Sequence, residues 1–359
     1  MSAAPDIDVL VVGAGVVGLA TAHAFALRGR EVVVAERHRA IGHETSSRNS
    51  GVIHAGIYYP PGSVKARASR DGRAALLRFC REHGVPHALP GKLVVATDET
   101  EHERLEAVRR RAKANGVRLQ WLSRAEAQAM EPALHCTAAL HSPGTGIVDA
   151  HALMLALQGE AEAHGTQVAL ETKVERVEAG RATLADGTTL SCHRIVVCGG
   201  LAATELLPEG LRRPDGTRWT TTFAKGSYFR LERGRAPFGR LIYPVPVAGG
   251  LGIHLTLDLA GTARFGPDVE WVDRLDYTVD PTRAQAFERG VRRFWPAMLE
   301  GALVPDYAGI RPKIAGRAEA DFTRLGVADH GMEGVTVLLG IESPGLTASL
   351  WLGEWAADA

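Results

Sequence analysis

The stretch VLVVGAGVVGLATAHAFAL, residues 9–27, decides how the rest of the sequence is read. Its first residues continue a short β-branched run, which is suited to a strand buried on both faces. Glycines follow at Gly13, Gly15 and Gly18, and the residues at 17–28 have the composition of a helix. In a strand–turn–helix unit, the first glycine permits the tight turn, the second lets the backbone approach a pyrophosphate, and the third lets the helix pack on the strand.

An acidic residue stands at the distance that this unit requires. A second β-branched run at 31–35 ends at Glu36, about twenty positions beyond the glycines, where a carboxylate accepts hydrogen bonds from ribose hydroxyls. The pattern therefore predicts a site for an adenine dinucleotide and leaves NAD and FAD open. The segment 37–42 does not resume the alternation of strands and helices but enters a long polar loop, which favours FAD.

Length and charge set limits on the whole chain. The 359 residues carry 41 basic and 41 acidic side chains, a formal net charge of zero. At about 100 to 200 residues per domain, this length predicts two domains or one large composite. A neutral chain provides no field to attract a polyanion, so no nucleic-acid partner is expected.

The uncharged stretch 9–27 is also about as long as a membrane span, but its glycines explain it better. A secretory signal needs a cationic segment in front, whereas Asp6 and Asp8 precede this stretch. The four cysteines have neither CxxC spacing nor the density of a disulfide scaffold, so we expect no metal site and a reduced, cytoplasmic compartment.

The pattern changes along the chain. Between Lys225 and Gly266 the period becomes two, which predicts successive antiparallel strands. On this alternation His254 faces a ligand cleft, opposite the apolar residues beside it. Elsewhere the spacing predicts helices at 73–83, 99–115, 121–130, 150–164 and 201–207 and from 345 onward, and strands at 92–96, 167–170, 173–177, 194–198 and 335–339.

Three motifs carry a family resemblance that covers essentially the whole chain: NSGVIHAGIYYPPGS (49–63), HSPGTGIVDAH (141–151) and GIESPGLTASL (340–350). Their order and spacing resemble the FAD-dependent oxidoreductases of the D-amino-acid oxidase superfamily, and within it the L-2-hydroxyglutarate dehydrogenases and oxidases. The sequence departs from the hydroxyglutarate pattern at Arg48 and at 308–313.

The resemblance implies an α/β fold. It consists of a Rossmann-type FAD-binding domain and a substrate domain built on a mostly antiparallel sheet. The FAD-binding domain is expected to be discontinuous, at 1–85, 145–205 and 305–359. The substrate or cap domain is expected at 86–144 and 206–304.

The resemblance and the motifs together imply the site residues. Substrate-binding candidates are Tyr58, Tyr243, His254 and Arg311, with the Arg311 guanidinium binding a substrate carboxylate at two points. The start of the last helix is expected beside the flavin, where its N-terminus would stabilise negative charge. The predicted FAD-binding residues are Gly13, Gly15, Val17, Gly18, Glu36, Arg37, Ser46, Ser47, Asn49, Ser50, Gly51, Val174, Gly199, Gly200, Gly345, Leu346 and Thr347.

The implied reaction is oxidation of a small 2-hydroxy acid, resembling L-2-hydroxyglutarate, to the 2-oxo acid by hydride transfer to flavin N5. A histidine would take the hydroxyl proton, because its pKa lies near working pH, and His54 and His254 are the candidates. His54 is also a candidate for covalent flavin attachment. We expect ion pairs for Lys225 and Lys313, although either lysine could promote reaction with oxygen if it lay over the flavin.

Several alternatives stay open. The chain could oxidise an amino acid or secondary amine, as glycine and sarcosine oxidases do, or act as an electron-transfer subunit without turnover. The electron acceptor could be O2 or a quinone, and peripheral contact with a membrane is possible.

Overall fold

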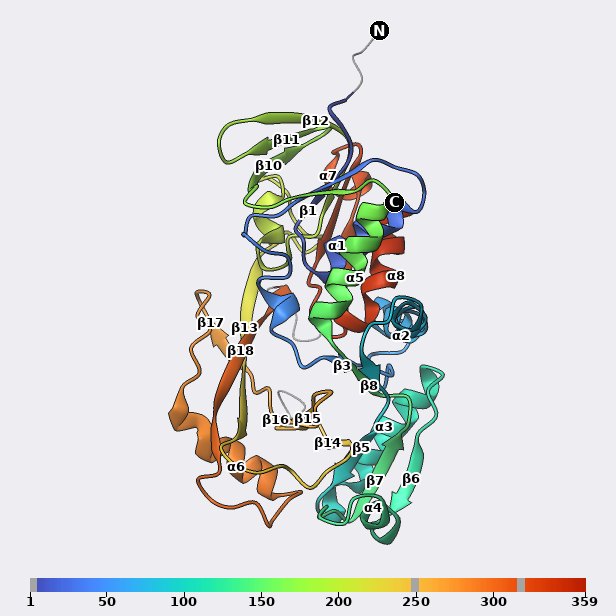
Figure 1. Cartoon of the computed structure of the whole chain (residues 1–359), viewed down its shortest axis with the longest axis vertical. Coiled ribbons are helices and arrows are strands. Elements are labelled where there is room, and N and C mark those ends of the chain that lie inside the picture. The colour runs from blue at the N-terminus through green and yellow to red at the C-terminus, as the bar shows by residue number, and fades with distance from the viewer. Residues whose placement is uncertain (1–4, 247–251, 315–319) are drawn as a thin grey trace.

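The computed structural model describes residues 5–246, 252–314 and 320–359. An eight-stranded sheet lies toward one end of the elongated molecule and a nine-stranded sheet toward the other, with a small three-stranded sheet between them (Figure 1). In the described part of the chain, no helix combines the length and apolar character needed to cross a bilayer.

The eight-stranded sheet has a parallel centre. Strands β9 (Gln167–Ala169), β2 (Val32–Ala35), β1 (Ile7–Val12), β12 (Thr189–Val197) and β20 (Val335–Leu339) run parallel in that order. Antiparallel strands flank them: β10 (Val174–Glu178) and β11 (Arg181–Leu184) continue from β12, and β19 (Thr323–Leu325) pairs with β20.

Strand β1 is buried on both faces, as its composition predicts. Val9 and Val11 belong to one hydrophobic cluster, and Leu10 and Val12 to another. The first cluster lies under a layer of helices, in which α1 packs on α5 and α8, and α8 packs on α2 (Figure 1). These helices are α1 (Val16–Ala26), α2 (Val64–Glu82), α5 (Ala150–Ala163) and α8 (Gly345–Ala357). The second cluster includes η3 (Gly200–Leu206), and α7 (Val327–His330) leads into β20.

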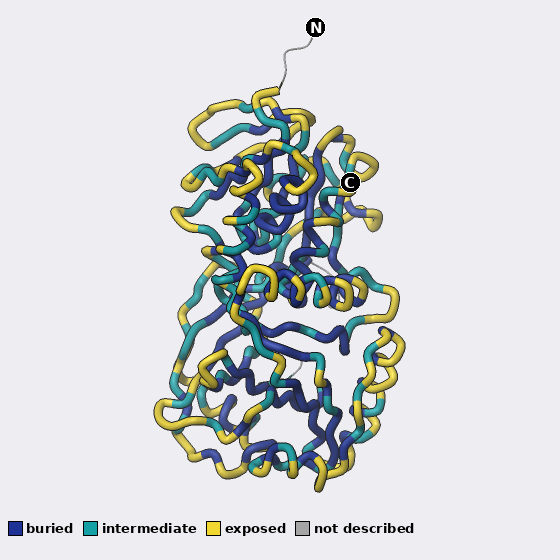
Figure 2. The backbone as a smooth tube through the Cα atoms, turned by 45° about the vertical axis from the view of Figure 1, so that its right-hand side comes forward, coloured by how far each residue is buried: buried dark blue, intermediate teal, exposed yellow. Residues whose placement is uncertain are grey.

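The nine-stranded sheet is antiparallel except where β14 and β5 run parallel. Its order is β17 (Glu270–Val272), β13 (Thr221–Leu231), β16 (Ala263–Phe265), β15 (Leu255–Leu257), β14 (Leu241–Pro244), β5 (Lys92–Ala96), β7 (Ala138–Ser142) and β6 (Gln120–Ser123), and β18 (Leu303–Ile314) pairs with β13. Around it lie η2 (Glu99–Glu101), α3 (His102–Ala114), α4 (Arg124–Met130), η4 (Pro281–Arg283) and α6 (Ala284–Arg292). Most of its strands are buried in the tube view (Figure 2).

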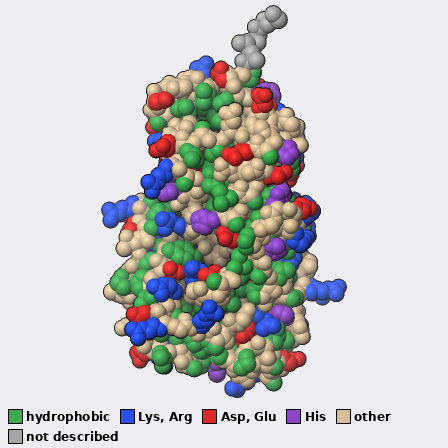
Figure 3. All heavy atoms as spheres, in the orientation of Figure 1, with side chains coloured by type: hydrophobic (Ala, Val, Ile, Leu, Met, Phe, Trp, Pro, Cys, Tyr) green, Lys and Arg blue, Asp and Glu red, His purple; other side chains and the backbone are tan. Residues whose placement is uncertain are grey.

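The small sheet consists of β3 (Val52–Ile53), β8 (Gly146–Val148) and β4 (His87–Ala88), and η1 (Thr45–Ser47) lies in the loop before it. It ties the loop after η1 to the segment that precedes α5, so that two of the family-like motifs meet. On the face shown in Figure 3, side chains of both charges are interspersed with hydrophobic ones.

Some predicted elements need correction. The helix expected at 121–130 begins as strand β6 and becomes helical only at Arg124, where Ser123 caps the helix with Glu126. The helix expected at 201–207 is the 3-10 helix η3, and the helix expected at 73–83 starts already at Val64. Strand β18 crosses the domain boundary predicted at 305, because its residues pair with β13 in the nine-stranded sheet. Residues 247–251 of the alternating region lie outside the described residues.

Candidate cofactor and active site

A cavity of about 1280 Å³ is lined by residues of both large sheets. Most of the predicted site residues lie on its wall. These are Gly13, Gly15, Val17, Glu36, Arg37, Ser46, Asn49, Ser50, His54, Tyr58, Val174, Gly199, Gly200, Tyr243, His254, Arg311, Gly345 and Leu346.

The glycine-rich turn at one end of the cavity has the geometry that a dinucleotide needs. Gly13 has φ +103°, and a Cβ there would lie 2.8 Å from the carbonyl oxygen of Cys198. The N-terminus of α1 opens on the cavity, with Gly15 and Val17 on the wall. Backbone without side chains at a helix N-terminus suits a pyrophosphate, because the amide dipoles point at the negative charge.

Glu36 lies at the end of β2 and is buried. Its Oε2 accepts the amide hydrogen of Ala14 at 2.8 Å, and its Oε1 accepts that of His38 at 2.9 Å. These two bonds fix the carboxylate on the cavity wall beside the glycine turn. Each carboxylate oxygen has capacity for a further donor, which fits the predicted contact to ribose hydroxyls.

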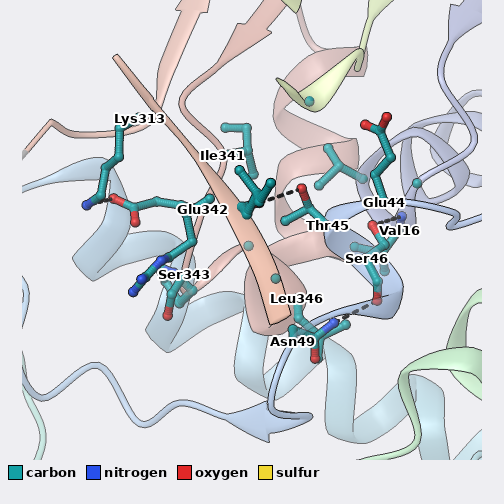
Figure 4. A pocket seen from close by; sticks show the side chains of 18 of the residues that line it. Val16, Glu44, Thr45, Ser46, Asn49, Lys313, Ile341, Glu342, Ser343 and Leu346 are labelled. Carbon is teal, nitrogen blue, oxygen red and sulfur yellow. Dashed lines mark hydrogen bonds and ion pairs between the residues drawn. The ribbon is translucent and has the colours of Figure 1, made fainter. Parts of the chain in front are cut away.

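The loop around η1 forms the next part of the wall (Figure 4). Ser46 Oγ accepts the amide hydrogen of Val16 at 3.0 Å, and Asn49 Nδ2 donates to the Ser46 carbonyl at 2.7 Å. Tyr307 on β18 donates its hydroxyl to the Asn49 carbonyl at 2.7 Å. The loop is therefore held on one side by α1 and on the other by β18, and it provides short polar side chains along the cavity.

Four predicted cofactor-binding residues do not line the cavity. Gly18 lies against the turn, where a Cβ would come 1.8 Å from the Gly13 carbonyl oxygen, so its role is packing of the helix on the strand. The Ser47 hydroxyl donates to the Gly42 carbonyl, and the Gly51 carbonyl accepts the amide hydrogen of Val148 in the small sheet at 2.8 Å. Thr347 is fully buried: its Oγ1 accepts the amide hydrogen of His54 at 2.9 Å and donates to the Val52 carbonyl at 3.2 Å.

His54 and His254 both reach the cavity, in different surroundings. His54 Nε2 lies 3.1 Å from the Ser343 hydroxyl, and burial, with a smaller contribution from the charge of Lys92, lowers the pKa of His54 to about 3. The imidazole is therefore neutral at working pH, with a lone pair that can accept a proton, but the expectation that its pKa lies near working pH needs correction. His254 is buried just before β15, and its ring stacks on Tyr243 with centroids 4.0 Å apart.

Arg311 on β18 is held by backbone carbonyls. Its Nε donates to Ala224 at 3.1 Å, and its Nη2 donates to Lys225 at 3.2 Å and to Asp268 at 2.7 Å. Both hydrogens of Nη2 are thus committed, and only Nη1 has no hydrogen bond within the described residues. The two-point clamp predicted from the sequence therefore needs correction: this geometry offers a carboxylate the Nη1 edge alone.

The two lysines considered for oxygen reactivity are both paired. Lys225 donates to the Thr278 carbonyl at 2.5 Å, lies 3.9 Å from Asp276, and does not line the cavity. Lys313 does line it, and its Nζ lies 2.5 Å from Glu342 Oε1 (Figure 4). The same oxygen accepts from Lys65 at 2.8 Å, so one buried carboxylate joins two ammonium groups.

The sequence interpretation missed Lys92, the first residue of β5. The side chain is 1% exposed, and its Nζ lies 4.3 Å from the centre of the Tyr243 ring and 4.7 Å from that of Tyr58. The sequence does contain a signal that this lysine is buried. Lys92 is the first residue of the apolar run 92–96, and in a strand it shares a face with Val94 and Ala96. That face is fully buried in the structure.

Comparison with known proteins shows the family to which this chain belongs. The family model described as FAD dependent oxidoreductase matches residues 8–359. The chain belongs to this family, with the fold predicted from its motifs. The glycine turn, the fixed carboxylate of Glu36 and the cavity itself fit FAD.

The chain is also similar to individual proteins within and around this family. The mitochondrial L-2-hydroxyglutarate dehydrogenase of Arabidopsis thaliana is 40% identical over 98% of this chain and 83% of its own length. The dithionite-reduced L-α-glycerophosphate oxidase of Mycoplasma pneumoniae with FAD bound superposes with a TM-score of 0.86 at 26% identity, over 98% of this chain and 93% of that one. Glycine oxidase from Bacillus cereus superposes with a TM-score of 0.81 over 98% and 94%, and at 22% identity it shares the fold alone.

Proposed function

We propose that this protein oxidises a small 2-hydroxy acid of the L-2-hydroxyglutarate type to the 2-oxo acid, with FAD as its cofactor. The observation that carries the proposal is the neutral imidazole of His54 on the wall of a cavity that also holds the Arg311 guanidinium. The name of the Arabidopsis relative supports the substrate class.

Each of these residues has a separate task. The Arg311 Nη1 attracts the substrate carboxylate, and the three carbonyl bonds to Nε and Nη2 hold the guanidinium plane so that little side-chain entropy is lost on binding. His54 accepts the hydroxyl proton as the hydroxyl becomes a carbonyl. The backbone amide of His54 donates to Thr347 Oγ1, which fixes the His54 backbone to the first turn of α8.

The FAD, when bound, accepts the hydride that leaves the α-carbon. On the protein side, the turn at Gly13 and Gly15 would hold its pyrophosphate, Glu36 its ribose, and the N-terminus of α8 at Gly345 would stabilise negative charge on the reduced ring. His254, stacked on Tyr243, is retained as the second candidate base.

The electron acceptor and the location belong to the same proposal. O2 and a quinone both remain acceptors to be tested, and a cytoplasmic location with occasional membrane contact is our working expectation.

Anaerobic titration of the purified holoprotein tests the proposal. A panel of L- and D-2-hydroxy acids, glycine, sarcosine and other N-methyl amino acids is added while the visible flavin absorbance is followed. We expect bleaching by an L-2-hydroxy diacid and not by its D enantiomer. Bleaching by amines alone would replace the proposal with an amine oxidase, and no bleaching by any compound would favour an electron-transfer subunit.

Two variants sharpen this experiment. His54→Gln keeps a polar group that can contact Ser343 but removes the base, so flavin reduction should slow by about 10²- to 10⁴-fold while the substrate still binds. His254→Gln is the matched control: if that variant alone loses reduction, the base is His254. Acid precipitation of the wild type shows in addition whether flavin stays attached to the polypeptide, as covalent attachment at His54 requires.

A further inference from the structure

Lys92 is a buried cation that pairs with no anion among the residues that the structure describes. Its side chain lies between two tyrosine rings, Tyr58 in the loop after β3 and Tyr243 on β14, at 4.7 and 4.3 Å from the ring centres. Within the described residues it forms no ion pair with a carboxylate. A lysine that is 1% exposed normally has such a partner, because moving an ammonium group out of water is costly.

The sheet explains why this ammonium group points toward the cavity wall. Lys92 pairs in parallel register with Leu241, and Val94 with Tyr243, so these four side chains share one face of the sheet. On its other side Lys92 pairs with Ser142 of β7, which is uncharged. Tyr58 and Tyr243 line the cavity, so Lys92 lies directly behind that wall.

The titratable and charged groups around Lys92 come from four segments. The loop after β3 contributes His54 and Tyr58, with Tyr59 beside Tyr58, and β14 contributes Tyr243. The segment before β15 contributes His254 through its stack on Tyr243. From α3, Arg111 bonds the Tyr58 carbonyl with its guanidinium, so it adds positive charge and no acid.

Lys92 acts on His54 through its charge, and it touches the tyrosine on which His254 stacks. The positive charge of Lys92 opposes protonation of His54, which adds to the effect of burial on the pKa of that imidazole. Tyr243 contacts both the Lys92 ammonium and the His254 ring. Removing or neutralising the Lys92 charge therefore changes the proton affinity of the His54 imidazole.

We propose that Lys92 is a positioning residue whose charge sets how readily His54 accepts the hydroxyl proton of the substrate, so that loss of the Lys92 proton switches the base to its more active form. The inference rests on the proposed function, in which His54 is the base. No bond to Lys92 forms or breaks in the reaction: it exchanges only its own proton with solvent.

The direction of the effect follows from Coulomb repulsion. Burial lowers the pKa of Lys92 to about 7, so its charge disappears as the pH rises through neutrality. While Lys92 is charged, a proton on His54 is repelled, and proton transfer from the substrate is opposed. When Lys92 is neutral the repulsion is gone, and the rate of flavin reduction rises.

Two measurements on holoprotein test this inference in the wild type and in Lys92→Met, an uncharged variant of similar shape. In the first, the rate of anaerobic flavin reduction is measured by stopped flow from about pH 6 to about pH 8.5. The wild-type rate should rise by about two- to tenfold, as a change of up to about one pKa unit in a general base implies. The variant should run at the higher rate throughout, and Lys113→Met, on the exposed face of α3, should keep the wild-type profile.

The second measurement needs no turnover. The protein is labelled with [¹³Cε1]histidine, and the His54 resonance is assigned by its loss in His54→Gln. In the wild type this resonance should shift in a step near neutral pH as the neighbouring charge disappears. In Lys92→Met the step should vanish, and the pKa of His54 should move upward.

The two measurements separate the two proposals. If no 2-hydroxy acid reduces the flavin but the His54 step is present and depends on Lys92, the proposed function fails and the coupling stands. If 2-hydroxy acids reduce the flavin but neither the rate profile nor the His54 step changes in Lys92→Met, Lys92 only packs against the tyrosines and the inference is overturned.

Discussion

Replacing Lys92 by methionine should make the protein more stable at neutral and acidic pH, although it removes a charge from the candidate site. The unfolded chain binds the lysine proton with a pKa of 10.5, whereas burial lowers this value to about 7 in the folded protein. Between these two values the unfolded state holds more protons, so wild-type stability increases with pH through that window. Below about pH 7 the folded protein bears the full cost of the buried ammonium.

The magnitude follows from the pKa change. At about 1.4 kcal/mol per unit, the fall from 10.5 to about 7 corresponds to a cost of about 5 kcal/mol. Lys92→Met removes this cost and fills a similar volume, so the variant should gain up to about 5 kcal/mol at pH 6. The gain should shrink by about 1.4 kcal/mol per pH unit above neutrality and disappear near pH 10.5.

Urea unfolding of the two holoproteins, followed by circular dichroism at several pH values, measures the gap in the free energy of unfolding between Lys92→Met and the wild type. Lys113→Met provides the matched control, because its ammonium group lies in solvent and the gap should stay small at every pH. A Lys92→Met variant that is less stable than the wild type at pH 6 would refute the reasoning. A gap that does not vary with pH would refute it too, since packing alone would then account for the difference.

Three further outcomes are expected. Gly18→Ala should yield protein that retains little FAD, measured by the flavin content of the purified protein, because the new Cβ would lie 1.8 Å from the Gly13 carbonyl oxygen and the turn must move. Glu342→Gln should lower the free energy of unfolding by about 3 to 5 kcal/mol, because the ammonium groups of Lys65 and Lys313 lose the carboxylate that joins them. Glu354→Gln, at an exposed ion pair, should cost less than about 1 kcal/mol. Arg311→Met should raise KM for 2-hydroxy acids by about tenfold or more, and an unchanged KM would remove Arg311 from carboxylate binding.

The cofactor half of the fold could be predicted from sequence because its signals are local. Glycine geometry, a β-branched run and an acid at fixed spacing lie within about thirty residues, and each is explained by backbone sterics or one hydrogen bond. The turn at Gly13 and the bonds to Glu36 are the structural counterparts. The pairing of β18 with β13 could not be predicted this way, since it joins residues that lie about 70 to 90 positions apart in the sequence.

The partners of charged side chains could not be predicted from the sequence either. The resemblance assigned Arg311 to a substrate carboxylate, but the carbonyls of Ala224 and Lys225 on β13 and of Asp268 in the loop before β17 occupy three of its five N–H donors. The ion pairs of Lys313 and Lys225 were expected as a class of interaction, while Glu342 as the shared carboxylate was not. A sequence states how many charges a chain has, and only tertiary structure decides which of them meet.

Lys92 shows why the surroundings of a charge, and not only its presence, matter for function. Lys92 costs stability and forms no ion pair within the described residues, and on our proposal its field acts on the base. Cost and effect here have one origin: the surroundings that penalise the ammonium also leave its field at His54 poorly screened. The gain in stability and the loss of pH dependence in Lys92→Met should therefore occur together. A variant that became more stable and kept the wild-type rate profile would separate them, and would show that the field of Lys92 does not reach the base.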